Sequence, residues 1–392
     1  MTSFEALTDA IDELAAKWAA DRPERQRRRH LERADFAALA DAGYLRTMVP
    51  VEQGGMWAGV AQTARPLCTV LRTLAAADSS VALVSSMHPA VLSFWMASPD
   101  PDQPQWEAQR QAVAASALDG MQWGTVTSEP GSGGDIARTR ATAEPLDAGS
   151  PAAVPDERSP ALSGDRYVLN GDKHFGSGLG VTDFMFTTAR PRGEDDPAAF
   201  VLDVRGLDLT AGPIEVIAEW DGAGMAATQS HAVRLHDAPA TRLAWHGTLP
   251  ELQLANGGFV LALFTSVVLG VVDAAVHEAE RVLAPRRDTL RPFEQLEWAR
   301  AETDHWVAVA AFERLLATIE RGDPAESLRA GLHTKLAVAE LAESVLSRLT
   351  RVIGGGAYAR RSPFAHWYED VRALGFLRPP WALAYDNLMA SR

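Results

Sequence analysis

The residue types best suited to chemistry lie in the segment TVTSEPGSGGD, which runs from Thr125 to Asp135. A strand-like run enters a turn here, and its glycines permit backbone conformations that are closed to other residues. Hydroxyl groups and exposed backbone amides would therefore converge at one place. Such a turn can donate hydrogen bonds to a flavin ring or to phosphate oxygens. The alternative interpretation is an ordinary loop between two strands.

One histidine, His88 in the segment SSMHPAVL, is a second candidate for chemistry. It follows an apolar helical run and precedes Pro89, and an imidazole ring can change its charge near neutral pH. His88 is therefore a candidate catalytic residue. The alternative is a hydrogen-bonded residue at the end of a helix.

Missing patterns argue against several other kinds of chemistry. The sequence contains no P-loop, no HExxH, no GxSxG and no strand followed by GxGxxG, which disfavours a nicotinamide cofactor in a Rossmann domain. Its one cysteine, Cys68, cannot form an intramolecular disulfide or a cysteine-based metal site, and its apolar surroundings suit a buried thiol. We therefore expect no metal site.

Length, charge and hydropathy narrow the class of protein. The 392 residues are 47% hydrophobic, which is enough for two or three domains with a buried core. The formal net charge of -14 argues against a broad surface for nucleic acid. No run approaches the roughly 18 uninterrupted apolar residues of a membrane span. We expect a cytoplasmic protein that binds small molecules and contacts neither nucleic acid nor membrane.

The elements that must position these residues change twice along the chain. Apolar residues recur at helical spacing up to about residue 118, β-branched and aromatic runs follow, and helical spacing returns from about Leu249. Within the β segment, Glu144 to Asp165 is rich in Pro, Ala, Ser and Asp and is predicted to be an exposed hairpin loop without a chemical role. The stretch from Phe259 to Val272 is apolar on almost every side, which predicts a helix covered by protein on more than one face.

Four motifs in this order resemble those of the acyl-CoA dehydrogenase superfamily. They are similar to the family's Thr-Glu-Pro turn, its G-x-K-x-x-[TS] strand, its late-barrel Gly-Met motif and its C-terminal glycine turn, and here they read SEPGSGGD (128–135), YVLNGDKHFGSG (167–178), WDGAGMAATQS (220–230) and IGGGAYARRSPFAHWYEDVRAL (353–374). The resemblance implies an α+β fold with an N-terminal α-helical domain (1–118), a middle β-barrel domain (119–247) and a C-terminal four-helix-bundle domain (248–392).

The same resemblance implies a cofactor and the residues that hold it. The family binds FAD between barrel and bundle, and a neighbouring subunit completes the site, so the chain is expected to form a tetramer or a dimer. Positions in this sequence that match the family's FAD contacts are Thr125, Thr127, Ser128, Phe175, Ser177, Arg287, Gly354 and Gly355. Around Arg287 the sequence departs from the family, because Leu290-Arg291 stands where Phe-Gly is usual.

The family's usual reaction needs a base that this sequence lacks. In the family a glutamate removes the α-proton of an acyl thioester while the β-hydride passes to flavin N5. One glutamate location corresponds to LGFLRPPW, Leu374 to Trp381, and the other falls near Val260, and neither contains a carboxylate. The first expectation is desaturation of an acyl thioester, with electrons passed to an acceptor protein. The alternatives are a monooxygenase supplied with reduced flavin by a reductase, and a catalytically silent binder of flavin or acyl groups.

Overall fold

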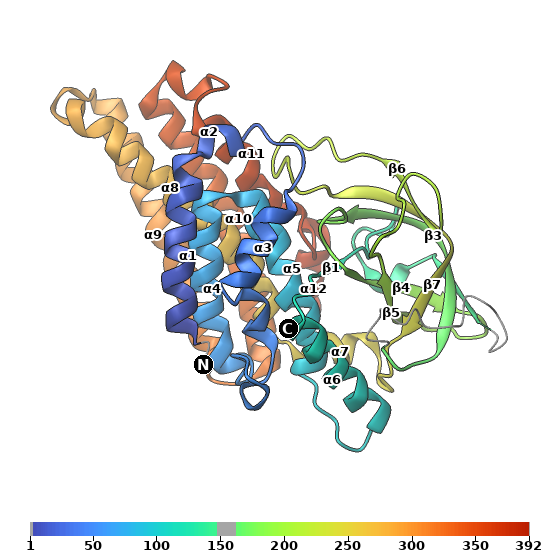
Figure 1. Cartoon of the computed structure of the whole chain (residues 1–392). Helices are drawn as coiled ribbons and strands as arrows, with labels where there is room; N and C mark the ends of the chain where they lie inside the picture. Colours follow the sequence, from blue (N-terminus) through green and yellow to red (C-terminus); the bar gives the residue numbers. More distant parts are fainter. Residues whose placement is uncertain (1–2, 147–161, 392) are drawn as a thin grey trace.

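The computed structural model describes residues 3–146 and 162–391 and shows a layer of helices beside a β-barrel (Figure 1). The chain passes from helices into the barrel and back into helices, as the sequence predicts. Most of the segment that the sequence predicts to be an exposed loop, Glu144 to Asp165, lies outside the described residues.

Helices and the short connections between them make up residues 3–118. The N-terminal helices are α1 (Phe4–Ala20), α2 (Arg22–Arg25), α3 (Arg33–Asp41), α4 (Val60–Ala77), α5 (Ser79–Met96) and α6 (Pro104–Leu118). Side-chain caps fix where two of them begin. Ser3 accepts a hydrogen bond from the Ala6 amide at the start of α1, and Asp78 accepts one from the Val81 amide at the start of α5. Such caps satisfy amides that the first helical turn leaves without a partner.

The middle of the chain closes into a barrel. Its strands are β1 (Trp123–Thr125), β2 (Thr142–Pro145), β3 (Arg166–Gly176), β4 (Phe184–Pro191), β5 (Ala198–Asp203), β6 (Ile214–Ala218) and β7 (His231–Arg242). The ring is β4-β2-β3-β7-β5, and β5 pairs back to β4 to close it, while β1 adds to β4 and β6 adds to β7. Leu169, Phe200 and Val233 are among the side chains buried in the barrel core.

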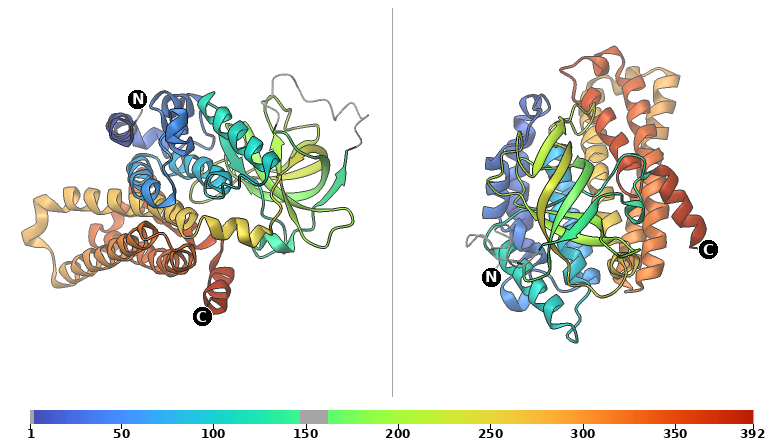
Figure 2. Two further views of the ribbon diagram at one scale, coloured as in Figure 1. Left: turned by 90° about the horizontal axis from the view of Figure 1, so that it is seen from below. Right: turned by 90° about the vertical axis from the view of Figure 1, so that its right-hand side faces the viewer.

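The C-terminal helices complete the helical layer. They are α7 (Leu249–Ala255), α8 (Phe259–Leu283), α9 (Pro292–Glu320), α10 (Pro324–Ile353), α11 (Pro363–Phe376) and α12 (Trp381–Ala390). Helix α8 packs against α9, α10 and α11, and it also packs against α4 and α5 of the N-terminal part. The two helical segments therefore share one hydrophobic core, whereas the sequence analysis predicts a separate C-terminal bundle. Figure 2 shows this joint layer on one side of the barrel.

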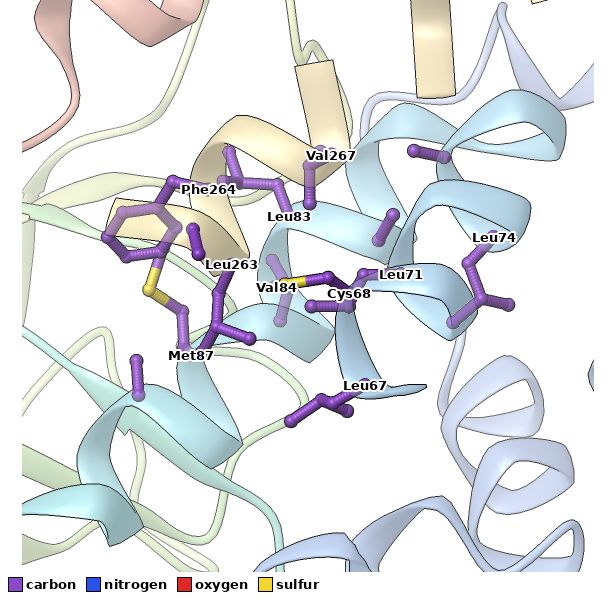
Figure 3. Packing of buried hydrophobic residues seen from close by; sticks show 14 of the residues in the cluster. Leu67, Cys68, Leu71, Leu74, Leu83, Val84, Met87, Leu263, Phe264 and Val267 are labelled. Atoms are coloured by element: carbon purple, nitrogen blue, oxygen red, sulfur yellow. The ribbon is translucent and has the colours of Figure 1, made fainter. Parts of the chain in front are cut away.

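Helix α8 is the centre of that core. The stretch Phe259–Thr289 has the length and composition of a membrane span, but 83% of its most apolar window is buried inside the protein. A Cβ atom on Gly270 would lie 2.2 Å from the Arg72 carbonyl oxygen, so only glycine allows α4 to approach this closely. Figure 3 shows Cys68 of α4 packed near Leu263 and Val267 of α8, and Cys68 is buried as its surroundings predict.

Candidate active site

A cavity of about 1880 Å³ opens between the barrel and the helices. Its helical wall is apolar and includes Leu83 and Met87 of α5 and Val260 and Phe264 of α8. Its barrel wall carries the polar residues of the glycine-rich turn and of the loop before β7. A large cleft with an apolar wall and a few convergent polar groups is the usual form of a cofactor and substrate site.

The glycine-rich turn is held in place by a buried ion pair. Glu129 of the turn contacts the ammonium group of Lys173 on β3, and the Lys173 side chain is completely buried. Lys173 Nζ also donates to the Thr188 carbonyl oxygen at 2.6 Å, and the Arg140 amide donates to Glu129 Oε2 at 2.6 Å. Burial alone would raise the pKa of Glu129, but the hydrogen bond and charge of Lys173 lower it. Glu129 therefore stabilises the turn, and its carboxylate is already occupied by these contacts.

Three hydroxyl groups form a chain along the barrel wall. Thr228 Oγ1 donates to the Met225 carbonyl oxygen at 2.8 Å, so its single proton is used. With Thr228 donating there, Ser230 would donate to Thr228 Oγ1 and Ser177 to Ser230, and each pair of Oγ atoms is 2.8 Å apart. In this arrangement Ser177 Oγ is an acceptor only, and a ligand that meets it would supply an N–H or O–H group.

The loop that carries Thr228 is tied to the C-terminal helices. The carboxylate of Asp370 on α11 accepts from the Met225 amide at 2.7 Å and from the Ser79 hydroxyl at 2.7 Å. Burial raises the pKa of Asp370 to about 6, although both hydrogen bonds oppose the shift. Asp370 therefore couples the position of the hydroxyl chain to the helical layer.

Four of the residues that the resemblance assigns to the cofactor line this cavity, namely Thr125, Ser128, Phe175 and Ser177. Phe175 is 58% exposed and has φ of 60°, a conformation that costs energy for a residue other than glycine. An exposed aromatic ring in a strained conformation at a cavity wall is suited to contact with a planar ligand. Thr127 is not part of the wall; its hydroxyl is buried without a partner among the described residues.

The other three assigned residues lie elsewhere. Arg287 is exposed in the connection between α8 and α9, at the end of the helical layer farthest from the barrel (Figure 1). Gly354 and Gly355 are exposed after α10 and do not line the cavity. One chain therefore does not bring these residues to the cavity, and their assignment to a neighbouring subunit's cofactor stays a prediction.

The position of His88 indicates a structural role. It is completely buried inside α5 and does not line the cavity. Its Nδ1 accepts from the Trp123 amide at 3.3 Å, so Nε2 carries the proton and donates to the Leu45 carbonyl oxygen at 3.1 Å. Burial lowers the pKa of His88 to about 4, although the Leu45 contact opposes the shift. The ring is neutral and has no free nitrogen, in line with the hydrogen-bonded alternative, although it lies within the helix and not at its end.

The two segments that correspond to the family's base locations contribute to the cavity wall without a carboxylate. Val260 lines the cavity, and so do Leu377, Arg378 and Pro379 of the segment Leu374 to Trp381. Three lining carboxylates are held by cations: Glu129 by Lys173, Glu194 by Arg242 and Glu369 by Arg372. The geometry offers no positioned base at either location.

Sequence reasoning missed some polar groups of the site. Asn256 is 2% exposed at the end of α7 and lines the cavity, and neither of its side-chain polar atoms has a partner among the described residues. The sequence gives no signal for it. Thr228 and Ser230 lie in a motif that the sequence analysis identifies, but their hydrogen-bond directions depend on contacts that only the fold makes.

Comparison with known proteins finds a family model that matches the C-terminal part of the chain and relatives that match most of it. The model of the acyl-CoA dehydrogenase C-terminal domain matches residues 264–378. An L-evernosamine nitrososynthase from Micromonospora sp. is 26% identical over 88% of this chain and 79% of its own length. An isobutylamine N-hydroxylase from Streptomyces viridifaciens is 26% identical over 88% of this chain and 84% of its own.

A solved structure shows the same fold over nearly the whole chain. FMN-bound TdsC from Paenibacillus sp. A11-2 superposes with a TM-score of 0.77 at 19% identity, covering 98% of this chain and 96% of that one. The likeness extends through helices, barrel and C-terminal helices. Residues 264–378 therefore match the acyl-CoA dehydrogenase C-terminal domain, and the chain as a whole has the same fold as TdsC.

Proposed function

We propose that this protein is a monooxygenase that uses reduced flavin supplied by a separate reductase. The observation that carries the proposal is the absence of a carboxylate near Val260 and in Leu374 to Trp381, the two segments that correspond to the family's base locations and that contribute to the cavity wall. No side chain that either segment places at the wall can remove an α-proton at neutral pH. Desaturation of an acyl thioester, the first expectation from the sequence, has less support than this alternative.

The names of similar proteins support the same choice. Two relatives that match most of the chain are a nitrososynthase and an N-hydroxylase. The structural neighbour TdsC is a dibenzothiophene monooxygenase. These names describe oxygen chemistry on nitrogen or sulfur compounds, and none of the three describes desaturation.

The hydroxyl chain supports the use of reduced flavin. In the arrangement in which Ser177 donates to Ser230, Ser177 Oγ can only accept a hydrogen bond from a ligand. Reduced flavin carries an N–H group at N5, whereas N5 of oxidised flavin is an acceptor. When bound, reduced flavin supplies the electrons for the insertion of one oxygen atom into the substrate. Ser177 would hold the reduced ring, and Phe175 would contact its face.

We propose FMN as the flavin, with FAD, the first expectation, as the alternative. The support for FMN is that TdsC, which has the same fold, was solved with FMN bound. Denaturing the purified protein and separating the released flavin by chromatography distinguishes the two. Release of FAD alone from freshly purified protein would favour the alternative.

We also propose that the chain self-associates, as a dimer or tetramer. Helix α9 exposes a group of large apolar side chains that a monomer would leave in water: Phe293, Leu296, Trp306 and Val307. Exposed apolar patches of this kind mark interfaces. Light scattering should give an oligomeric mass that Trp306→Arg lowers. A monomeric wild-type protein would refute this part of the proposal.

Oxygen incorporation tests the proposed function. The purified protein receives photoreduced FMN under ¹⁸O₂ together with a panel of amines, thioethers and indoles, and products are analysed by mass spectrometry. The proposal expects a product that has gained one ¹⁸O atom. A matched assay mixes the oxidised flavoprotein anaerobically with acyl-CoA thioesters. Flavin bleaching there, without oxygenated product in the first assay, would restore desaturation. Failure to bind flavin in either redox state would favour the silent binder.

A further inference from the structure

Arg378 stands at the point where the C-terminal segment meets the glycine-rich turn. Its Nη2 lies 3.4 Å from Ser128 Oγ, and the side chain lines the cavity. Pro380, two residues later, packs closely against the same turn. A Cβ atom on Gly134, which has φ of 83°, would lie 2.6 Å from Pro380 Cδ. This contact requires glycine at position 134 and fixes the connection that carries Arg378.

The guanidinium group of Arg378 has no counter-charge in contact. Within residues 3–146 and 162–391, no carboxylate lies within 4.0 Å of it, and its Nε atom is buried without a hydrogen-bond partner. Burial lowers the pKa of Arg378 to about 10, and the charge of Asp135 opposes this only in part. Arg378 is therefore a cation at neutral pH.

Two of the nearby carboxylates already have cationic partners, and Asp135, the carboxylate whose charge acts on Arg378, makes no ion pair with it within 4.0 Å. Glu129, adjacent to Ser128, is paired with Lys173, and Glu369 on α11 is paired with Arg372 at 2.7 Å. A half-buried guanidinium group whose Nε atom has no hydrogen-bond partner loses hydration that the fold replaces only in part. An anion that enters the cavity would supply the counter-charge and the hydrogen-bond acceptors that Arg378 lacks.

We infer that Arg378 binds an oxyanion, a carboxylate or sulfonate, on a substrate whose body is apolar. The planar guanidinium group matches such an anion with two parallel hydrogen bonds. The apolar wall formed by Leu83, Met87 and Phe264 would contact the rest of the molecule. This inference rests on the proposed function for the reaction that follows, but not for the binding itself. The same charge could instead meet the anionic ring of reduced flavin, and the experiment separates the two sources.

Calorimetric titration with matched ligands tests the inference. The full-length protein, saturated with oxidised FMN, is titrated with 3-phenylpropanoate and 3-phenylpropanamide, and with benzenesulfonate and benzenesulfonamide. Each acid should bind the wild type more tightly than its neutral partner, by about 10- to 100-fold, as expected for hydrogen bonds to a charged group. Arg378→Met should abolish this preference, and Arg378→Lys should retain part of it.

Arg372→Met is the matched control. Arg372 lines the same cavity but is paired with Glu369, so its loss should leave the preference for acids unchanged. Thermal unfolding of each variant verifies that it is folded, and Arg378→Gln replaces the Met variant if that one is not. The preference is a ratio of affinities within one variant, so a uniform loss of affinity does not imitate the effect.

Two results would overturn the inference. One is equal binding of acid and neutral partner, or no binding of either acid, by the wild type. The other is a preference that survives Arg378→Met. If that variant instead weakens reduced FMN alone, in an anaerobic titration, the anion belongs to the flavin. Oxygen incorporation plays no part in these readouts, so a failed oxygenation assay and a failed binding assay remain distinguishable.

Discussion

Two cations contact the glycine-rich turn under opposite conditions. Lys173 is surrounded by acceptors, because Glu129, the Thr188 carbonyl oxygen and Thr139 all contact its ammonium group. Arg378 has one long contact to Ser128 and no carboxylate partner in the described part of the chain. A charge whose partners are complete holds the fold together. A charge whose partners are missing is available to a ligand. The comparison assigns structure to the barrel side of the turn and recognition to the C-terminal side.

The largest expected effect comes from breaking the complete site. Glu129→Gln leaves the Lys173 ammonium buried without a counter-charge, which should cost about 3 to 5 kcal/mol of unfolding free energy. Adding Lys173→Met should recover part of the loss, because the unpaired charge is then gone. Urea unfolding of both single variants and the double variant measures the coupling. A change below about 1 kcal/mol for Glu129→Gln would show that the pair does not stabilise the turn.

Lys335 of α10 is another cation without a partner, but unlike Arg378 it does not line the cavity. It is 1% exposed, its ammonium group has no partner among the described residues, and burial lowers its pKa from 10.5 to about 8. Here the unfolded chain binds the proton more tightly, so wild-type stability should rise as the pH increases from about 8 to 10.5. Lys335→Met should remove this rise and add about 2 to 3 kcal/mol at pH 7. Equal stability of variant and wild type at pH 7 would contradict the absence of a partner.

At the buried carboxylate of Asp370, the pH dependence of stability should have the opposite sign. Asp370 is held by neutral donors, and burial raises its pKa from 3.8 to about 6. The folded state then binds the proton more tightly, so stability should fall as the pH rises from about 4 to 6. Asp370→Asn can keep both hydrogen bonds and should be more stable than the wild type at pH 8, by up to about 3 kcal/mol, but not at pH 4. Parallel stability curves of the two proteins over this range would argue against the shift.

The smallest effect on stability is expected at Arg378. Arg378→Met removes a charge that has no counter-ion, so the unfolding free energy should stay within about 1 kcal/mol of the wild-type value or rise. The same urea titration as for Glu129→Gln gives the contrast directly. A loss as large as that of Glu129→Gln would mean that Arg378 is a structural residue and would remove the distinction between the two cations.

The sequence predicts much of the fold but only part of the site. The ordered motifs around Glu129, Lys173 and Met225 indicate the superfamily, and with it the order of helices and barrel. They do not reveal that α8 packs against α4, because that contact joins segments about 200 residues apart. The absence of a base near Val260 and in Leu374 to Trp381 is visible in the sequence, and it raises the monooxygenase alternative.

What the sequence cannot supply is the surroundings of each side chain. His88 is a candidate for chemistry by its residue type, yet burial and two backbone contacts occupy both its nitrogens. In the sequence, nothing distinguishes Arg378 from a surface arginine. The fold places it beside Ser128, which lies 250 positions earlier in the chain. The direction of the hydroxyl chain likewise depends on Thr228 meeting the Met225 carbonyl oxygen.

Anaerobic titration with flavin measures whether the cavity prefers reduced flavin, as we propose. The wild type is titrated with oxidised and with photoreduced FMN, and Ser230→Ala serves as the matched variant because it frees the Ser177 proton to donate. The account predicts that the wild type binds reduced FMN at least about 10-fold more tightly and that Ser230→Ala reduces this preference. Equal or tighter binding of oxidised FMN by the wild type would contradict it.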